Sequence, residues 1–466
     1  RKVTVMDDLQ ALGVDPTKAE HGPDRLITVK VIGAAGDHDG PLLRRLLLPM
    51  HPADVAELLQ NAPKETARTI FTLIGEDLDA EVYAELEDEL REFALEFIPA
   101  SKLAQKLDDL DTDDAAAIVA ELDDEDRAEV LAAASDDVRV AVEGALSFEE
   151  ETAGRLMQRE FVAAPQHWDV GQTIDFMRKT GEDLPDLFFD IYVVSPAMQP
   201  IGAIPVSKLM RAKRTMLLQD LMETPEIIVD PETDQEVVAH AFQKYHLISA
   251  PVVDRSGRLT GMITVDDIVR VIQDENEEDL LALAGVRDAS TADSVWSSVK
   301  SRLPWLVINL VTALIASVLI SKFQASIEKI VALAVMMPMV ASMGGNAGTQ
   351  TVAVAVRALA ARELTPGNSG RIILREVITG LVNGAVFAVL LSSVALFWFQ
   401  SVLLSVTIAL AILLNLSVAG LAGILIPLTL KRLGQDPAVS SGVLVTFVTD
   451  MVGFVAFLGL ATLIIL

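Results

Sequence analysis

Cysteine is absent from this chain of 466 residues, and charge is almost absent from its last third. The lack of cysteine excludes a disulfide framework and any thiolate metal site, and it leaves the cellular compartment open. The sequence begins with Arg1, so we expect it to be part of a longer chain, and the lack of a visible signal peptide at this end excludes nothing.

The charge is divided between two parts of the chain. Mean hydropathy is positive (+0.40), yet the net charge is −29. Residues 300–466 hold ten Lys or Arg and five Asp or Glu, which leaves a net charge of −34 for residues 1–299. A very acidic soluble part therefore precedes a weakly basic, hydrophobic part.

The hydrophobic part contains five long apolar stretches. A helix needs about 20 mainly apolar residues to cross a hydrocarbon core of about 30 Å. A buried core helix would explain one such stretch, but not five in succession. We therefore predict a transmembrane pore domain over 304–466 with spans at roughly 304–321, 330–358, 377–399, 402–428 and 442–466.

Basic residues orient these spans. Lys and Arg gather before the first span, after the second and after the fourth, whereas the other two connections hold few of them. Positively charged connections stay on the cytoplasmic side. This predicts a multi-pass protein of the cytoplasmic (inner) membrane, with the acidic part in the cytoplasm and the C-terminus outside.

The soluble part contains a helical repeat. The segment 51–74 returns at 111–134, with its apolar face in register. Each copy reads as a helical hairpin, which predicts a superhelical N-domain over 46–150 with acidic residues mostly on its solvated faces. Residues 1–45 are left unassigned, although "RLITVKVIG" (25–33) is compatible with a strand.

A second repeat follows. The segment 191–210 returns at 250–269, and each copy reads as strand, turn, strand and helix, after an earlier strand ("EFVAAP" or "EIIVDP") and helix. The pattern resembles a tandem pair of α/β cystathionine-β-synthase (CBS) domains, at 151–220 and 221–283. Such pairs often bind adenine nucleotides, so ATP is a candidate ligand. Asp266 would also serve as a simple helix cap.

The second span has a polar centre. Pro338 is followed by "GGNAGTQT" (344–351), a run that forms helices poorly. Loosened backbone inside a membrane is tolerated where it lines a wet cavity, whereas small residues also allow close helix packing. Because Asn346 and Gln350 are one turn apart, we favour a cavity lining that includes Gly345 and Gly348.

The fifth span carries one carboxylate, Asp450, about nine residues from its cytoplasmic end. No Lys, Arg or His lies at a comparable depth in any span, so Asp450 is either protonated or faces a cation in water. Thr446 and Thr449 add oxygen atoms nearby. A symmetric dimer would bring two such carboxylates together, and hard oxygen ligands of this kind suit Mg²⁺ that keeps its water. The lack of Cys, and of His in the spans, argues against Zn²⁺ or copper.

Several separate segments resemble the MgtE family of Mg²⁺ channels. They are "SFEEETAGRLMQREFV" (147–162), "DPETDQEVV" (230–238), "TVDDIV" (264–269), "GGNAGTQT" (344–351), "RALAARELTP" (357–366) and "KRLGQDPAVSSGVLVTFVTD" (431–450). The resemblance implies a Mg²⁺ channel that is a homodimer with its pore on the dimer axis. It also implies that Asp450 coordinates the hydrated ion. As partners we expect the lipid bilayer and a second copy, and no nucleic acid.

The resemblance also implies gating, in which acidic residues of the N-domain, the CBS pair and a connecting "plug" helix (284–303) share cytoplasmic Mg²⁺. The candidates in this chain are Asp113, Asp114, Asp266, Asp288 and Asp293. The connector also carries basic residues, so we expect weaker Mg²⁺-dependent closure than in relatives with an acidic plug.

Four other classes of protein compete with a Mg²⁺ channel. An alternating-access transporter or exporter of divalent cations would usually show repeats among its spans, and 304–466 shows none. An anion channel conflicts with Asp450, and a tethered sensor has no need for an unpaired carboxylate in the membrane. An enzyme is disfavoured because the sequence contains no nucleophile–base constellation and no phosphate loop.

Overall fold

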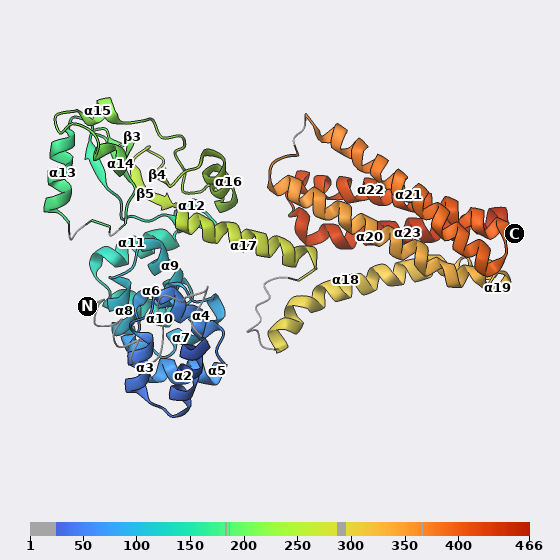
Figure 1. Cartoon of the computed structure of the whole chain (residues 1–466), viewed down its shortest axis with the longest axis horizontal. Helices are drawn as coiled ribbons and strands as arrows, with labels where there is room; N and C mark the ends of the chain where they lie inside the picture. Colours follow the sequence, from blue (N-terminus) through green and yellow to red (C-terminus); the bar gives the residue numbers. More distant parts are fainter. Residues whose placement is uncertain (1–24, 182–183, 186, 287–294, 365–366) are drawn as a thin grey trace. The chain divides into compact units, whose positions relative to one another are not determined.

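The computed structural model describes residues 25–181, 184–185, 187–286, 295–364 and 367–466. The chain divides into two compact units, 1–272 and 273–466 (Figure 1).

Within the described residues, the first part of unit 1 is entirely helical: α2 (Arg25–Gly36), α3 (Gly40–Leu47), α4 (Pro52–Gln60), α5 (Lys64–Ile74), η1 (Gly75–Asp77), α6 (Ala80–Ala84), α7 (Asp88–Leu95), α8 (Ala100–Leu107), α9 (Thr112–Ala120), α10 (Asp124–Ala133) and α11 (Asp136–Leu146).

The segment 25–33, which was left unassigned and is compatible with a strand by its sequence, lies in helix α2. Its β-branched residues suit a strand, but Ile27, Val31, Ala34 and Ala35 follow the helical period and are buried. This face packs against α3 and α5. Burial of a helical stripe outweighs intrinsic propensity here.

The two copies of the helical repeat form matching hairpins. Helices α9 and α10 begin at the positions equivalent to the starts of α4 and α5, as the sequence predicted. Equivalent residues lie in one hydrophobic core, with Val55 2% and Ala115 1% exposed in the first helices of each pair. In the second helices, Ile70 is fully buried and Val130 is 2% exposed.

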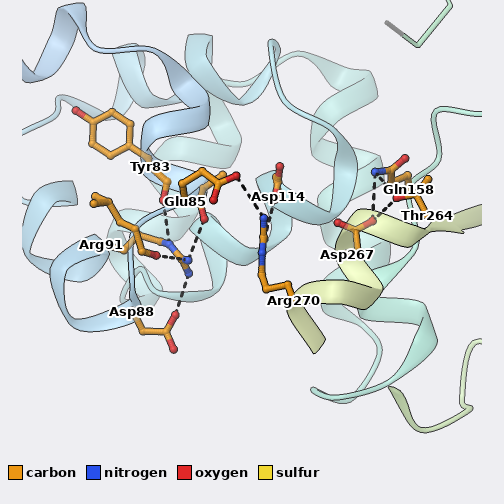
Figure 2. Close-up of polar contacts among 11 residues, drawn as sticks. Tyr83, Glu85, Asp88, Arg91, Asp114, Gln158, Thr264, Asp267 and Arg270 are labelled. Atoms are coloured by element: carbon orange, nitrogen blue, oxygen red, sulfur yellow. Dashed lines mark hydrogen bonds and ion pairs between the residues drawn. The ribbon is translucent and has the colours of Figure 1, made fainter. Parts of the chain in front are cut away.

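An arginine closes two of the helix ends in the same way. Arg91 donates from Nε and Nη2 to the carbonyl oxygens of Tyr83, Ala84 and Leu86 (3.0, 3.2 and 2.5 Å; Figure 2). Arg127 makes the equivalent contacts with the carbonyls of Val119, Ala120 and Leu122. The last carbonyls of a helix have no partner within the helix, and the guanidinium group supplies several donors at once.

We expect Arg91→Ala to destabilise the N-domain by about 3 kcal/mol, because it leaves three carbonyls without their donor. The measurement is hydrogen–deuterium exchange of α6 and α7 in the full-length protein, where this loss means roughly hundredfold faster exchange. Arg127→Ala is the matched control and should have a smaller effect, since the Arg127 side chain is 34% exposed and that of Arg91 10%. Equal effects would contradict this account.

The rest of unit 1 is the CBS pair. Strands β1 (Ala163–Pro165), β2 (Asp190–Val194) and β3 (Pro200–Pro205) form one sheet, and β4 (Ser249–Val253) and β5 (Leu259–Thr264) form the other. The described helices around them are α12 (Ala153–Leu156), α13 (Val170–Lys179), α14 (Val206–Leu209), α15 (Leu218–Leu221) and α16 (Gln235–Tyr245), followed by α17 (Val265–Leu283), which crosses into unit 2.

Strand pairing reproduces the second repeat of the sequence. Val193 pairs with Gly202, and the equivalent Val252 pairs with Gly261. Both hairpins also have a register irregularity at the following residue. The earlier strand of the second copy differs from the prediction, because "EIIVDP" forms a single parallel bridge, from Val229 to Val252.

Unit 2 is a bundle of long helices (Figure 1). The described elements are α18 (Val295–Ser321), the short α19 (Gln324–Lys329), α20 (Ala332–Ala360), α21 (Ser369–Phe399), α22 (Val402–Arg432) and α23 (Pro437–Ile464). Among the described residues, α18, α21, α22 and α23 are long and apolar enough to cross a membrane. Helix α20 has 29 residues but a more polar centre. Helix α22 packs against α20, α21 and α23 and is the most buried of the four apolar helices.

Two features of unit 2 differ from the sequence prediction. Helix α20 runs without a break through Gly344–Thr351, so the expected loosening of the backbone is wrong. Residues 295–303 of the expected connecting helix are the first turns of α18, which continues through Pro304 into the first span. Residues 287–294 lie outside the described part of the chain.

Candidate ion pathway and acidic cluster

Helices α20 and α23 touch where the sequence placed the pore residues. A Cβ added at Gly348 would lie 2.4 Å from Val445 Cγ1 and 3.5 Å from Thr449 Cγ2, so a larger residue would force the helices apart. A Cβ at Gly345 would lie 3.9 Å from Thr446 Cγ2, in ordinary contact. Glycine therefore serves close helix packing here, the alternative that the sequence had left open.

Several predicted pore residues are exposed on the surface of this bundle. Asn346 and Gln350 of α20 and Thr446 of α23 are exposed, and Asp450 is partly exposed. Thr446 Oγ1 donates to the Gly442 carbonyl (2.9 Å), which leaves its lone pairs available. Polar groups on a membrane-spanning helix are costly against lipid, so this face requires water or a second protein surface.

Thr449 differs from its neighbours. It is fully buried, and its Oγ1 donates to the carbonyls of Val445 and Thr446 at 3.0 Å each. A hydroxyl held in this way faces its own helix. Asp450 has no ion pair with any residue that the structure describes. Asp450 and Thr446 therefore have oxygen atoms that are accessible at the surface of α23, whereas the hydroxyl of Thr449 is buried against its own helix.

Sequence reasoning missed one polar residue of this unit, Asn415 of α22. It is fully buried, and its Nδ2 donates to the Val340 carbonyl of α20 (2.9 Å). Its Oδ1 is buried without a hydrogen-bond partner among the described residues. The signal was present in the sequence, because Asn415 is the only amide side chain in 402–432.

The soluble unit contains an acidic cluster where the N-domain meets the CBS pair. Asp113, in the first turn of α9, is buried, and its Oδ1 has no partner within the described ranges. Burial raises the pKa of Asp113 well above its ordinary value, and the charge of Asp267 adds to the effect. Asp267 accepts from Thr264 Oγ1 (2.6 Å) and Gln158 Nε2 (3.4 Å; Figure 2). Burial raises the pKa of Asp267 to about 6.

Arg270 joins the two domains beside this cluster. From α17 its Nη1 lies 3.5 Å from Asp114 Oδ1, and its Nη2 lies 3.6 Å from Glu85 Oε1 (Figure 2). Two acidic residues of the N-domain thus share one cation from the second CBS domain. The guanidinium group therefore partly balances the charge of Asp114.

The predicted regulatory residues lie in different parts of the structure. Asp113 and Asp114 lie in the cluster, while Asp266 is exposed and its neighbour Asp267 is the residue beside Asp113. Asp288 and Asp293 lie outside the described residues. Among the residues described, no three His, Asp or Glu side chains converge closely enough to hold a metal ion.

The CBS pair also contains a cavity of about 550 Å³. Aromatic side chains (Phe188, Tyr192) and carboxylates (Asp190, Glu223) line it. Ser249 Oγ hydrogen-bonds both Asp190 Oδ2 (2.8 Å) and the Tyr192 hydroxyl (2.7 Å), which ties the two CBS repeats together.

A long helical bundle with an unpaired carboxylate, joined to a helical domain and a CBS pair, defines a membrane transporter of cations with soluble domains. Family models agree with this class. They match the divalent cation transporter MgtE at 337–460, the MgtE intracellular N domain at 50–151 and the CBS domain at 218–274.

Whole proteins match as well. The chain is 33% identical over 421 residues to the magnesium transporter MgtE of Bacillus subtilis, covering 90% of this chain and 93% of the relative. It is 31% identical over 450 residues to that of Thermus thermophilus, covering 94% and 98%. A solved cytosolic domain of the Mg²⁺ channel MgtE in complex with ATP is 30% identical, with a TM-score of 0.48 over 52% of this chain and 99% of that one. The chain belongs to the MgtE family of magnesium transporters.

Proposed function

We propose that this protein transports Mg²⁺ as a homodimeric channel whose pore lies on the dimer axis. The observation that carries the proposal is the polar face of α20 and α23, where Asn346, Gln350 and Thr446 are exposed and Asp450 has no basic partner among the described residues. Lipid would not tolerate this face, whereas a water-filled pore between two copies would.

The ligand set suits a hydrated divalent ion. Each protomer contributes one carboxylate, so a two-fold axis beside α23 brings two together. Mg²⁺ gives up its water reluctantly and is usually held by one or two carboxylates with several waters retained. The amide oxygens of Asn346 and Gln350 would accept hydrogen bonds from those waters.

We propose that the acidic cluster is the regulatory metal site. Asp113 Oδ1 is an unpartnered, buried carboxylate oxygen near Asp267 in the described part of the chain, which is the condition that a shared cation would relieve. Arg270 already balances Asp114, so Mg²⁺ has fewer carboxylates to bridge and closes the channel less strongly than an all-acidic cluster would. The soluble unit is then cytoplasmic and the C-terminus outside, as the basic connections of the spans require.

We also propose that the CBS cavity takes an adenine nucleotide. Its volume of about 550 Å³ fits a small ligand, and Phe188 and the exposed Phe189 offer faces for a base. Asp190 and Glu223 would accept hydrogen bonds from ribose hydroxyls. Isothermal titration of the full-length protein with ATP should show binding that Asp190→Ala weakens.

The absence of cysteine gives a direct test of the dimer axis. Thr446→Cys introduces a single thiol on the proposed axis face, and Leu381→Cys places one on a residue of α21 that is 50% exposed, as the control. We expect mild oxidation in membranes to cross-link Thr446→Cys into a dimer and to leave Leu381→Cys monomeric on a denaturing gel. The reverse pattern would refute this axis.

A planar bilayer containing the purified protein separates the channel from its alternative. A channel gives unitary Mg²⁺ currents, whereas an alternating-access transporter or exporter gives saturable flux without them. Flux without unitary currents would therefore favour the transporter.

A further inference from the structure

We propose that Asn415 is a positioning residue of the ion pathway, which sets the register of α20 and α23 and thereby the selectivity among divalent cations. The inference rests on the proposed pathway along these two helices. Its basis is a separate observation, the convergence of three helices on one buried amide.

The amide of Asn415 occupies the point where α20, α22 and α23 meet. Its Nδ2 donates to the Val340 carbonyl of α20 at 2.9 Å. A Cβ added at Gly344 of α20 would lie 2.2 Å from Nδ2, and one added at Gly453 of α23 would lie 2.8 Å away. Both neighbouring helices thus present a glycine to the same amide, because no side chain fits between them.

These contacts flank the proposed pathway on both helices. On α20, Gly344 immediately precedes Gly345 and Asn346. On α23, Gly453 follows Asp450 by less than one helical turn. A shift at Asn415 therefore moves the amides of α20 relative to the carboxylate of α23.

Simple packing does not explain an asparagine at this place. Its Oδ1 is buried and unpartnered within the described part of the chain, which is an unfavourable state that an alanine or leucine would avoid. A single buried asparagine in a helical interface fixes one register at the expense of stability. Only the register that places the Val340 carbonyl opposite Nδ2 satisfies the donor.

The register bears on selectivity because Mg²⁺ passes with much of its water, whereas Mn²⁺ and Ca²⁺ exchange water more readily and accept looser coordination. A pathway with a fixed distance between the α20 amides and Asp450 favours the ion of one hydrated size. When the register relaxes, that preference is lost while passage of ions continues.

The test uses Asn415→Leu, which keeps the number and branching of the side-chain heavy atoms and removes the hydrogen bond, in proteoliposomes of the full-length protein. The control is Ser417→Ala, because Ser417 Oγ donates within its own helix, to the Leu413 carbonyl (2.7 Å). Flux of Mg²⁺ and of Mn²⁺ is measured per folded dimer, counted by size-exclusion chromatography. We expect Asn415→Leu to lower the Mg²⁺-to-Mn²⁺ flux ratio at least fivefold and Ser417→Ala to leave it unchanged.

A second variant covers the case in which Asn415→Leu does not fold. Gly453→Ala keeps the amide but displaces it, and it should lower the same ratio. An unchanged ratio in the folded variants overturns the inference, even where total flux falls, because a merely structural role changes the amount of folded protein and not its selectivity. Asp450→Asn is measured in parallel: native Mg²⁺ flux in that variant would refute the pathway itself, whereas lost flux with an unchanged Asn415→Leu ratio would refute the role of Asn415 alone.

Discussion

Asp450→Asn is expected to lower Mg²⁺ flux by at least about tenfold while the protein still folds and dimerises. Asparagine keeps the shape and one oxygen of the side chain but removes both negative charges of the proposed dimer site. A divalent ion at the low-dielectric centre of a membrane depends on such charges, since its own hydration is incomplete there. The measurement is Mg²⁺ uptake by proteoliposomes, or growth of cells that lack other Mg²⁺ importers.

The control for this variant is Asp436→Asn on the same helix. Asp436 caps the N-terminus of α23, where its side chain accepts from the Ala438 amide (2.8 Å), and asparagine caps a helix equally well. Flux should therefore stay at the native level. If both variants carried Mg²⁺ at the native rate, Asp450 would not be the site; if both lost it, the effect would be one of local charge at α23 in general.

Regular repetition explains why much of the fold was predictable. The return of 51–74 at 111–134 placed the helical hairpins, and the return of 191–210 at 250–269 placed the two CBS hairpins, whose strand register the structure then shows to be equivalent. The two copies of a repeat fold in similar environments, so their shared pattern of apolar positions persists even where single residues differ. Helix α2 had no such partner, and its strand-like residues gave no sign of the face that tertiary packing would bury.

The site was predictable in its chemistry but not in its contacts. Asp450 stood out because a carboxylate in an apolar span is rare. Thr449 shares its sequence neighbourhood, yet its rotation on α23 buries it against α20. The choice between Asp266 and Asp267 likewise depends on which way α17 faces, and Asn415 gains its importance from two glycines on other helices. Each of these facts depends on the packing of helices that are distant in sequence.

Asp113→Asn should make the contact between the N-domain and the CBS pair less dependent on Mg²⁺. In EDTA near pH 7.5 we expect exchange of the α9 and α17 amides in the full-length protein to slow by about tenfold, because the buried side chain at position 113 no longer carries a charge that repels Asp267. Addition of Mg²⁺ to this variant should then slow the exchange of these amides only slightly further. Glu125→Gln, which removes an exposed charge from α10, is the control and should behave as the native protein.

In EDTA the contact between the N-domain and the CBS pair should also depend on pH. The pKa values of Asp113 and Asp267 are raised in the folded protein, so the folded state binds protons more tightly than the unfolded one. The contact is therefore most stable below the ordinary carboxyl range and loses stability as pH rises through about 6, where Asp267 ionises beside Asp113, Asp114 and Asp266. Exchange in the native protein should quicken over that range, and Asp113→Asn should flatten the change.

Arg270→Gln should act in the opposite direction to Asp113→Asn. It removes the cation that joins Asp114 and Glu85, so exchange of α9 and α17 in EDTA should quicken, and Mg²⁺ should protect them more than in the native protein. A built-in guanidinium and a bound metal ion neutralise the same carboxylates, so the loss of one increases the demand for the other. Mg²⁺ flux through Arg270→Gln should accordingly be inhibited more steeply by Mg²⁺ on the side of the soluble unit. Unchanged Mg²⁺ sensitivity in both variants would mean that the cluster is structural and that gating lies elsewhere in the chain.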